Sequence, residues 1–154
     1  AGASTADVLK RTDGAQQRDL SQCVAELDTF LSSVCSAMPV DLMAGCDDPC
    51  NYLLPQQPLH QCLVRQANRL STLCLASNPH GCDVGGVHLL GSSGQPLDDM
   101  QRYVASDDRL ASLEASLQMR HLAPTAPDTL GCFPFVESDP FVLEKSPHVY
   151  FAGN

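Results

Sequence analysis

The residues best suited to chemistry gather in the segment Cys46-Asp47-Asp48-Pro49-Cys50, which places two thiols and two carboxylates close together. Thiolates and carboxylates are common zinc ligands, so this segment could supply half of a zinc site. A structural zinc site needs a second pair of ligands, whereas the other cysteines are single and widely spaced. The two thiols also have three residues between them, and redox-active pairs usually have two. The spacing therefore favours free cysteines over a zinc or redox centre.

The histidines are the other potential ligands, and they are spread along the chain: His60, His80, His88, His121 and His148. Only His121 has a suggestive position, because it lies between a predicted helix and a loop that contains Pro124 and Pro127. Serine chemistry is not indicated, since Gly91-Ser92-Ser93-Gly94 is one residue shorter than the Gly-x-Ser-x-Gly turn of serine hydrolases. No segment has the glycine spacing of a phosphate-binding loop. The sequence thus offers no complete catalytic motif.

Composition narrows the class of protein. The 154 residues are 44% hydrophobic, which suits one core, and no apolar run approaches the length of a membrane-spanning helix. The formal net charge is −9, so the chain as a whole repels a phosphate backbone and unassisted DNA binding is not expected. The eight cysteines follow a start without any stretch like a signal peptide, which predicts a reducing compartment.

The elements that must position these residues alternate between helices and strands. Apolar residues at i, i+3 and i+4 predict a helix over 18–37, after a flexible lead-in over 1–17. Short apolar runs predict strands over 40–43, 71–76, 86–91 and 148–152. A turn is expected near 78–82, and the proline-rich segment 45–60 is expected to be irregular. Strands interleaved with helices predict an α/β domain.

Two further helices are expected in the second half of the chain. One covers 95–104, and the other opens at Ser106-Asp107-Asp108 and presents Leu110, Leu113, Leu117 and His121 on one side. The acidic pairs Asp98-Asp99 and Asp107-Asp108 are most simply helix starts, where carboxylates meet the positive end of the helix dipole.

Part of the chain resembles a known family. The segment RHLAPTAPDTLGCFPF over 120–135 resembles the signature of the small (B) subunit of eukaryotic replicative DNA polymerases, most closely in its delta branch. Three more stretches agree with it: VDLMAGCDDPCN over 40–51, LPQQPLH over 54–60 and DPFVLEKSPHVYFAGN over 139–154. The resemblance covers nearly everything after residue 18. It implies a calcineurin-like phosphoesterase fold, a two-sheet β sandwich flanked by helices, here over 18–154 and incomplete at both ends.

The resemblance also implies that the catalytic machinery of this fold is lost. Active relatives hold two metal ions with a Gly-Asn-His-Asp/Glu loop, a later histidine and a terminal Gly-His-x-His motif. The corresponding positions here are Gly45, Cys46, Asp47, Asp48, His121, Gly153 and Asn154. Cys46 and Asn154 replace ligands and Asp47 replaces the proton donor, so no catalytic residue, metal or other cofactor is expected. Asp48 and Asp128 are instead expected to cap backbone amides near the former site.

The function implied is that of a non-catalytic regulatory subunit in DNA replication. It would bind the C-terminal cysteine-rich region of the polymerase catalytic subunit and an accessory subunit in the nucleus, with only indirect DNA contact and no membrane. The acidic balance suits a basic protein partner. Phe133, Phe135 and Phe141 are candidate partner-binding residues, although they could equally cover the sheet. The alternative function is an active metal-dependent phosphodiesterase or exonuclease of the same fold.

Overall fold

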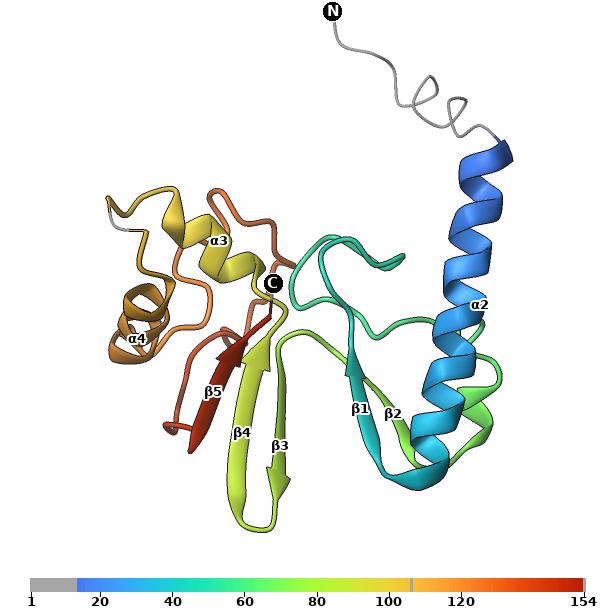
Figure 1. Cartoon of the computed structure of the whole chain (residues 1–154). Coiled ribbons are helices and arrows are strands. Elements are labelled where there is room, and N and C mark those ends of the chain that lie inside the picture. The colour runs from blue at the N-terminus through green and yellow to red at the C-terminus, as the bar shows by residue number, and fades with distance from the viewer. Residues whose placement is uncertain (1–13, 106, 154) are drawn as a thin grey trace, which may run out of the picture. The chain divides into compact units, whose positions relative to one another are not determined.

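A computed structural model describes residues 14–105 and 107–153 (Figure 1). The predicted lead-in up to residue 13, the helix-opening Ser106 and the former-site Asn154 lie outside the described residues. The architecture is mixed α/β, with two small sheets of order β1-β2 and β3-β4-β5. The elements in chain order are α2 (Gly14–Ala37), β1 (Val40–Met43), η1 (Ala67–Arg69), β2 (Leu73–Ala76), β3 (His80–Val84), β4 (Val87–Ser92), α3 (Gln95–Gln101), α4 (Arg109–Met119) and β5 (Val149–Ala152). The chain divides into two compact units.

The first unit comprises the chain up to Asp41 together with His60–Cys74, and the long helix α2 dominates it. This helix begins at Gly14, four residues before the predicted start, and ends at Ala37 as predicted. Leu31 and Cys35 are buried on its inner face. The Thr72 hydroxyl donates a hydrogen bond of 2.6 Å to the carbonyl of Cys35, which ties the end of the helix to the segment that follows η1.

The second unit comprises Leu42–Leu59 and Leu75–Asn154 and contains the three-stranded sheet. Strands β3 and β4 form an antiparallel hairpin, and β5 pairs with β4 in parallel. The predicted turn near 78–82 is wrong, because β3 occupies His80–Val84 and the chain turns at Gly85-Gly86. Both glycines have positive φ, of 58° and 84°, which suits the tight turn of a two-residue hairpin. The strand lacks a continuous apolar run, so its hydrophobicity gave no signal.

The register of the sheet separates a core face from an outer face. Leu90 pairs with Tyr150, and both pack against the buried hydrophobic cluster. Neighbouring residues in a strand point to opposite faces, so the partly exposed Val149 and Phe151 lie on the outer face. The Phe151 ring crosses Gly91, where an added Cβ would lie 2.4 Å from ring atoms. This close approach explains the need for glycine in the middle of β4.

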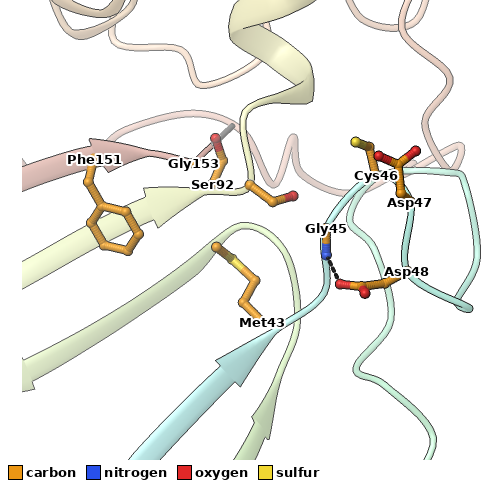
Figure 2. A pocket seen from close by; sticks show the side chains of 9 residues that line it. Met43, Gly45, Cys46, Asp47, Asp48, Ser92, Phe151 and Gly153 are labelled. Atoms are coloured by element: carbon orange, nitrogen blue, oxygen red, sulfur yellow. Dashed lines mark hydrogen bonds between the residues drawn. The ribbon is translucent and has the colours of Figure 1, made fainter. Parts of the chain in front are cut away.

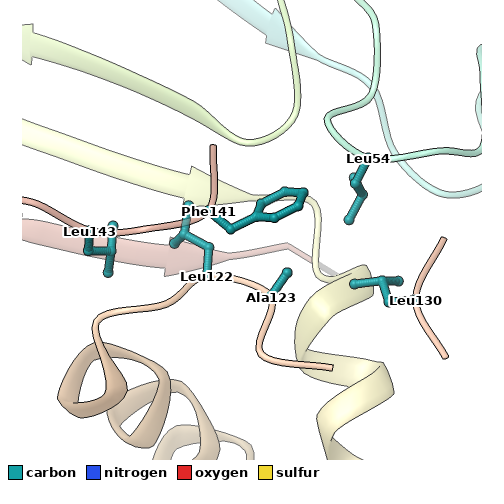
Figure 3. Packing of buried hydrophobic residues seen from close by; sticks show 6 residues of the cluster. All are labelled: Leu54, Leu122, Ala123, Leu130, Phe141 and Leu143. Atoms are coloured by element: carbon teal, nitrogen blue, oxygen red, sulfur yellow. The ribbon is translucent and has the colours of Figure 1, made fainter. Parts of the chain in front are cut away.

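The core cluster of the second unit is built largely from loops (Figure 3). Its members are Leu54, Leu122, Ala123, Leu130, Phe141 and Leu143. The backbone N–H of Leu54 donates to the carbonyl of Gly131, and the N–H of Phe133 donates to the carbonyl of Leu54. The signature-like segment 120–135 therefore has a structural role, because its apolar side chains and backbone hold the loops to the sheet.

Helices α3 and α4 form close to the predicted ranges, but the residues that they bury differ from those expected. Helix α3 ends at Gln101 instead of 104, and Asp108 caps α4 as predicted by accepting from the N–H groups of Leu110 and Ala111. Asp99 is more than a helix start, because its buried carboxylate bonds to the side chains of Arg102 and Thr129. The predicted apolar side of α4 is wrong at Leu110, which is 77% exposed, whereas two serines in the helix are buried.

No helix in the described part of the chain is long and apolar enough to cross a membrane.

Candidate functional site

The loop that follows β1 borders a groove of about 420 Å³ in the second unit (Figure 2). The groove is lined by Met43, Gly45, Cys46, Asp47, Asp48, Ser92, Ser93, Phe151 and Gly153. The structure thus places the loop 45–48 and Gly153 at one groove, and their correspondence to a former metal site stays a prediction. His121 does not line this groove. The backbone N–H of Gly153 donates to the carbonyl of Ser92, which fixes the end of β5 beside the end of β4.

The donor atoms of this loop do not converge as metal ligands do. The Asp48 carboxylate turns back and accepts a hydrogen bond of 2.6 Å from the backbone N–H of Gly45 (Figure 2). Among the residues that the structure describes, no set of three potential ligands within 4.8 Å of one another includes Cys46, Asp47, Asp48 or His121. Within the described residues, these side chains therefore do not form a cluster of metal ligands.

The two cysteines of the loop are held in their thiol form. Lost solvation, the hydrogen bond to Asp47 and its negative charge raise the pKa of Cys46 above its ordinary value. Lost solvation and the charge of Asp48 likewise raise the pKa of Cys50, against a lowering effect of Gln56. Metal binding and nucleophilic attack both require the thiolate. The raised pKa values lower the fraction of reactive thiolate, which disfavours the redox interpretation of this segment.

Behind the loop lies a buried polar network centred on Asn78, which is fully buried. Its amide nitrogen lies 2.9 Å from Gln56 Oε1, 2.6 Å from Ser93 Oγ and 3.0 Å from Gln95 Oε1. Its side-chain oxygen accepts from the backbone N–H of Ser93 at 3.1 Å. The backbones of Asn78 and Gln56 exchange two hydrogen bonds as well.

This network reaches the former-site loop through Gln56. The Gln56 amide nitrogen donates to the carbonyl of Gly45 at 2.9 Å, while Asp48 binds the N–H of the same glycine. The two hydrogen bonds fix Gly45 from both sides and connect the loop to the ends of β2 and β4. Nothing in the sequence indicates that Asn78 and Gln56 are buried. An Asn-Pro pair and a glutamine in a proline-rich loop are both typical of irregular surface structure.

Both ring nitrogens of His121 are occupied by protein groups. Nδ1 accepts from the backbone N–H of Ala123 at 3.2 Å, and Nε2 lies 2.9 Å from Asp139 Oδ2. This arrangement assigns the proton to Nε2, which then donates to the carboxylate. Asp139 also accepts from the N–H of Phe141 at 2.8 Å. His121 therefore fastens the loop that carries Phe141 to the end of α4.

Asp139→Asn should lower the free energy of unfolding by about 1 kcal/mol at neutral pH, since a charged acceptor of two hydrogen bonds is lost. The hydrogen bonds from His121 and from the Phe141 backbone hold the pKa of Asp139 below its ordinary value of 3.8. Between the folded pKa and 3.8 the unfolded chain binds more protons, so this contribution is full above that window and disappears as pH falls through it.

Urea unfolding of the full-length protein between neutral and acidic pH measures this difference between variant and wild type. Glu137→Gln is the matched control, because Glu137 lies exposed in the same loop and should show no such pH-dependent difference. A deficit of Asp139→Asn that persists unchanged at acidic pH would contradict the assignment.

Asp48→Ala should destabilise the fold by about 1 kcal/mol, because the Gly45 N–H loses its acceptor at the edge of the polar network. Thermal unfolding of the full-length protein gives the measurement. Asp47→Ala removes a neighbouring exposed carboxylate that accepts no backbone hydrogen bond within the described residues, and it should change stability by less than about 0.5 kcal/mol. Equal melting temperatures for both variants would refute capping by Asp48.

The side chain of Asp128, which was also expected to cap backbone amides, is exposed and makes no hydrogen bond within the described residues.

The three candidate aromatic residues have different environments. Phe141 is 3% exposed and belongs to the core, whereas Phe135 is 53% exposed. Phe133 is partly buried. Phe133 and Phe135 are therefore the two candidates that a partner could contact. Phe141 instead packs in the core cluster and anchors its loop there.

Comparisons with known proteins identify the family of this chain. The family model for the B subunit of DNA polymerases alpha and epsilon matches residues 3–154. The chain therefore belongs to the B-subunit family of replicative DNA polymerases.

Within that family, the chain is similar to small subunits of polymerase delta. It is 46% identical to the DNA polymerase delta small subunit of Oryza sativa subsp. japonica, over 90% of this chain and 32% of that protein. It is 45% identical to the DNA polymerase delta subunit 2 of Drosophila melanogaster, over 91% of this chain and 32% of the relative. It is 33% identical to the DNA polymerase delta small subunit of Saccharomyces cerevisiae, over 88% of this chain and 34% of that protein. The chain thus spans about a third of the length of these curated relatives.

Proposed function

We propose that the protein is a non-catalytic regulatory subunit of DNA polymerase delta that supports DNA replication by holding other subunits together. The observation that carries this proposal is the use of the former-site groups in ordinary hydrogen bonds. Asp48 binds the backbone of Gly45, and both nitrogens of His121 bind protein groups. Lone pairs used in these hydrogen bonds are not available to metal ions in this arrangement, which supports a degenerate phosphoesterase domain as the favoured interpretation.

The domain is proposed to have the calcineurin-like fold, a two-sheet sandwich flanked by helices over 18–154. The outer face of the sheet β3-β4-β5 supports it. Val84, Val87, Val149 and Phe151 lie on that face and are 63%, 41%, 44% and 43% exposed. An apolar sheet face needs a covering layer, and a second sheet is the layer that a sandwich provides.

The proposed partners are the C-terminal cysteine-rich region of the catalytic subunit and an accessory subunit, in the nucleus. The net charge of −9 supports protein partners over direct DNA contact, because it repels phosphates and attracts basic protein surfaces. The relatives named as polymerase delta small subunits support membership of the same assembly.

A pull-down at moderate salt tests this proposal, with the full-length protein and the C-terminal cysteine-rich region of the delta catalytic subunit. One-to-one capture is expected, together with no manganese-dependent hydrolysis of a nitrophenyl phosphodiester. Failure of capture by a protein shown to be folded would overturn the scaffold role. Manganese-dependent hydrolysis that Asp48→Asn abolishes would instead establish the phosphodiesterase alternative.

A further inference from the structure

A second groove, of about 280 Å³, lies on the surface of the second unit and shares no lining residue with the groove beside the loop 45–48. It is formed by residues 126–127, 132–135 and 139–141, and we call it the proline-aromatic groove. Phe133 and Phe135 form part of its wall, and the buried Phe141 forms another part. Its volume falls just below the range of about 300–1,000 Å³ typical of small-molecule sites, which suits one or two side chains of a protein ligand.

The backbone of the groove limits how it can recognise a ligand. Three of the lining residues, Pro127, Pro134 and Pro140, have no N–H to donate. A ligand strand therefore cannot pair regularly with this wall as it would with a sheet edge. Recognition must depend on apolar side chains that insert between the aromatic rings, and Phe and Tyr anchors of this kind are typical of interface cores.

The chain segments that form the groove carry charge of one sign, and Arg120 and Lys145 lie just outside them. Between residues 121 and 144 there are four acidic side chains and neither lysine nor arginine. The acidic residues are Asp128, Glu137, Asp139 and Glu144, and all four are exposed. Asp139 lines the groove, and Asp128 follows the lining Pro127 directly. A ligand that carries positive charge beside its apolar anchor complements this border.

The same charge excludes the other classes of occupant. DNA and anionic lipids would bring more negative charge to an acidic border. A second copy of this chain would bring a net charge of −9. A basic segment of another protein is the occupant that the charges favour.

We propose that the proline-aromatic groove binds a protein segment in which a large apolar or aromatic side chain is flanked by lysine or arginine. Phe135 is its main accessible anchor, and Asp128 and Glu137 attract the flanking cations. The inference rests on the proposed function in one respect. The C-terminal region of the catalytic subunit, one of the two binding probes used in the test below, is chosen because of it.

The test compares dissociation constants of the full-length protein for two probes. One is that C-terminal region, and the other is a short synthetic peptide with Leu and Phe anchors between lysines. Phe135→Asp should weaken binding of both probes by about tenfold or more. Tyr103→Asp is the matched control, because Tyr103 is 61% exposed outside the groove and its replacement adds the same charge. Phe135→Leu should keep most of the affinity, and circular dichroism checks that every variant is folded.

Charge reversal tests the flanking cations separately. Glu137→Lys and Asp128→Lys should each weaken binding by about threefold, and the effect should shrink at high salt. Glu114→Lys, on the exposed side of α4, is the matched control and should have no such effect. Unchanged or tighter binding of the reversed variants would overturn the basic character of the occupant.

The outcomes separate this inference from the proposed function. Binding of the peptide alone, lost in Phe135→Asp, would support the groove and overturn the catalytic-subunit partner. Capture of the catalytic-subunit region that Phe135→Asp leaves unchanged, with no peptide binding, would overturn the groove alone. Peptide binding that survives Phe135→Asp would reflect general attraction between charges and would also overturn the groove. Failure of the wild-type protein to bind either probe would overturn both.

Discussion

Asn78→Ala is expected to lower the free energy of unfolding of the full-length protein by about 3–4 kcal/mol, the largest effect of any polar substitution considered for this chain. Asn78 is fully buried and its side chain meets four polar groups. Alanine removes this partner from the N–H of Ser93 and from the amide oxygens of Gln56 and Gln95, of which Gln56 is buried and Ser93 and Gln95 are partly buried. Each such buried group costs about 1–3 kcal/mol, and partial relaxation keeps the sum near the lower end.

Urea unfolding followed by circular dichroism measures the effect. Asn68→Ala is the matched control, because Asn68 is exposed and makes one long hydrogen bond of 3.4 Å to Gln61. Its replacement should cost less than about 0.5 kcal/mol. A loss below about 1 kcal/mol for Asn78→Ala would show that the network contributes little to stability.

A double-mutant cycle shows whether the network acts as a unit. If Asn78 and Gln56 depend on each other, Gln56→Ala should cost much less in the Asn78→Ala background than in wild type, with a coupling energy of about 1–3 kcal/mol. Additive losses would mean that the two residues stabilise the fold independently. Strong coupling would show that these hydrogen bonds act together in joining the loop 45–48 to the strands.

The sequence predicted the elements with strong periodicity and missed those held by tertiary contacts. Helix α2 and strand β1 have clear apolar patterns and lie close to their predicted bounds. Strand β3 has the sequence His-Gly-Cys-Asp-Val, without an apolar run, and its pairing with β4 stabilises it. The outward position of Leu110 likewise reflects packing, because buried Ser112 and Ser116 allow close approach on the opposite side of α4.

Tertiary contacts also limit how much of the candidate site can be predicted from the sequence. The loop 45–48 and Gly153 line one groove, although they are distant in the sequence. His121 does not line this groove, and its ring nitrogens bond to Ala123 and Asp139. A sequence shows which residues can ligate or donate. It does not show which of their lone pairs and protons are already used by backbone groups distant in the chain.

Asp28→Ala should have the second largest effect, a loss of about 3 kcal/mol in the free energy of unfolding. Asp28 is a 6% exposed carboxylate on the inner face of α2. Its oxygens accept from the N–H of Gln66 at 2.9 and 3.0 Å and from the N–H of Ala67 at 2.9 Å. These groups open the 3-10 helix η1, whose free N–H groups favour a negative charge. The substitution leaves both N–H groups without an acceptor and separates η1 from α2.

Asp28→Asn separates the charge from the shape of this side chain. The amide keeps one acceptor oxygen but turns its NH₂ group toward backbone donors, so an intermediate loss of about 1–2 kcal/mol is expected. Glu26→Ala is the matched control on the same helix, because Glu26 is exposed and bonds only to Gln22. Its removal should cost less than about 0.5 kcal/mol. Urea unfolding of the full-length protein should rank the losses as Asp28→Ala, Asp28→Asn and Glu26→Ala. If Asp28→Ala cost no more than Glu26→Ala, packing of Leu31 and Cys35 would hold α2 in place without help from the carboxylate.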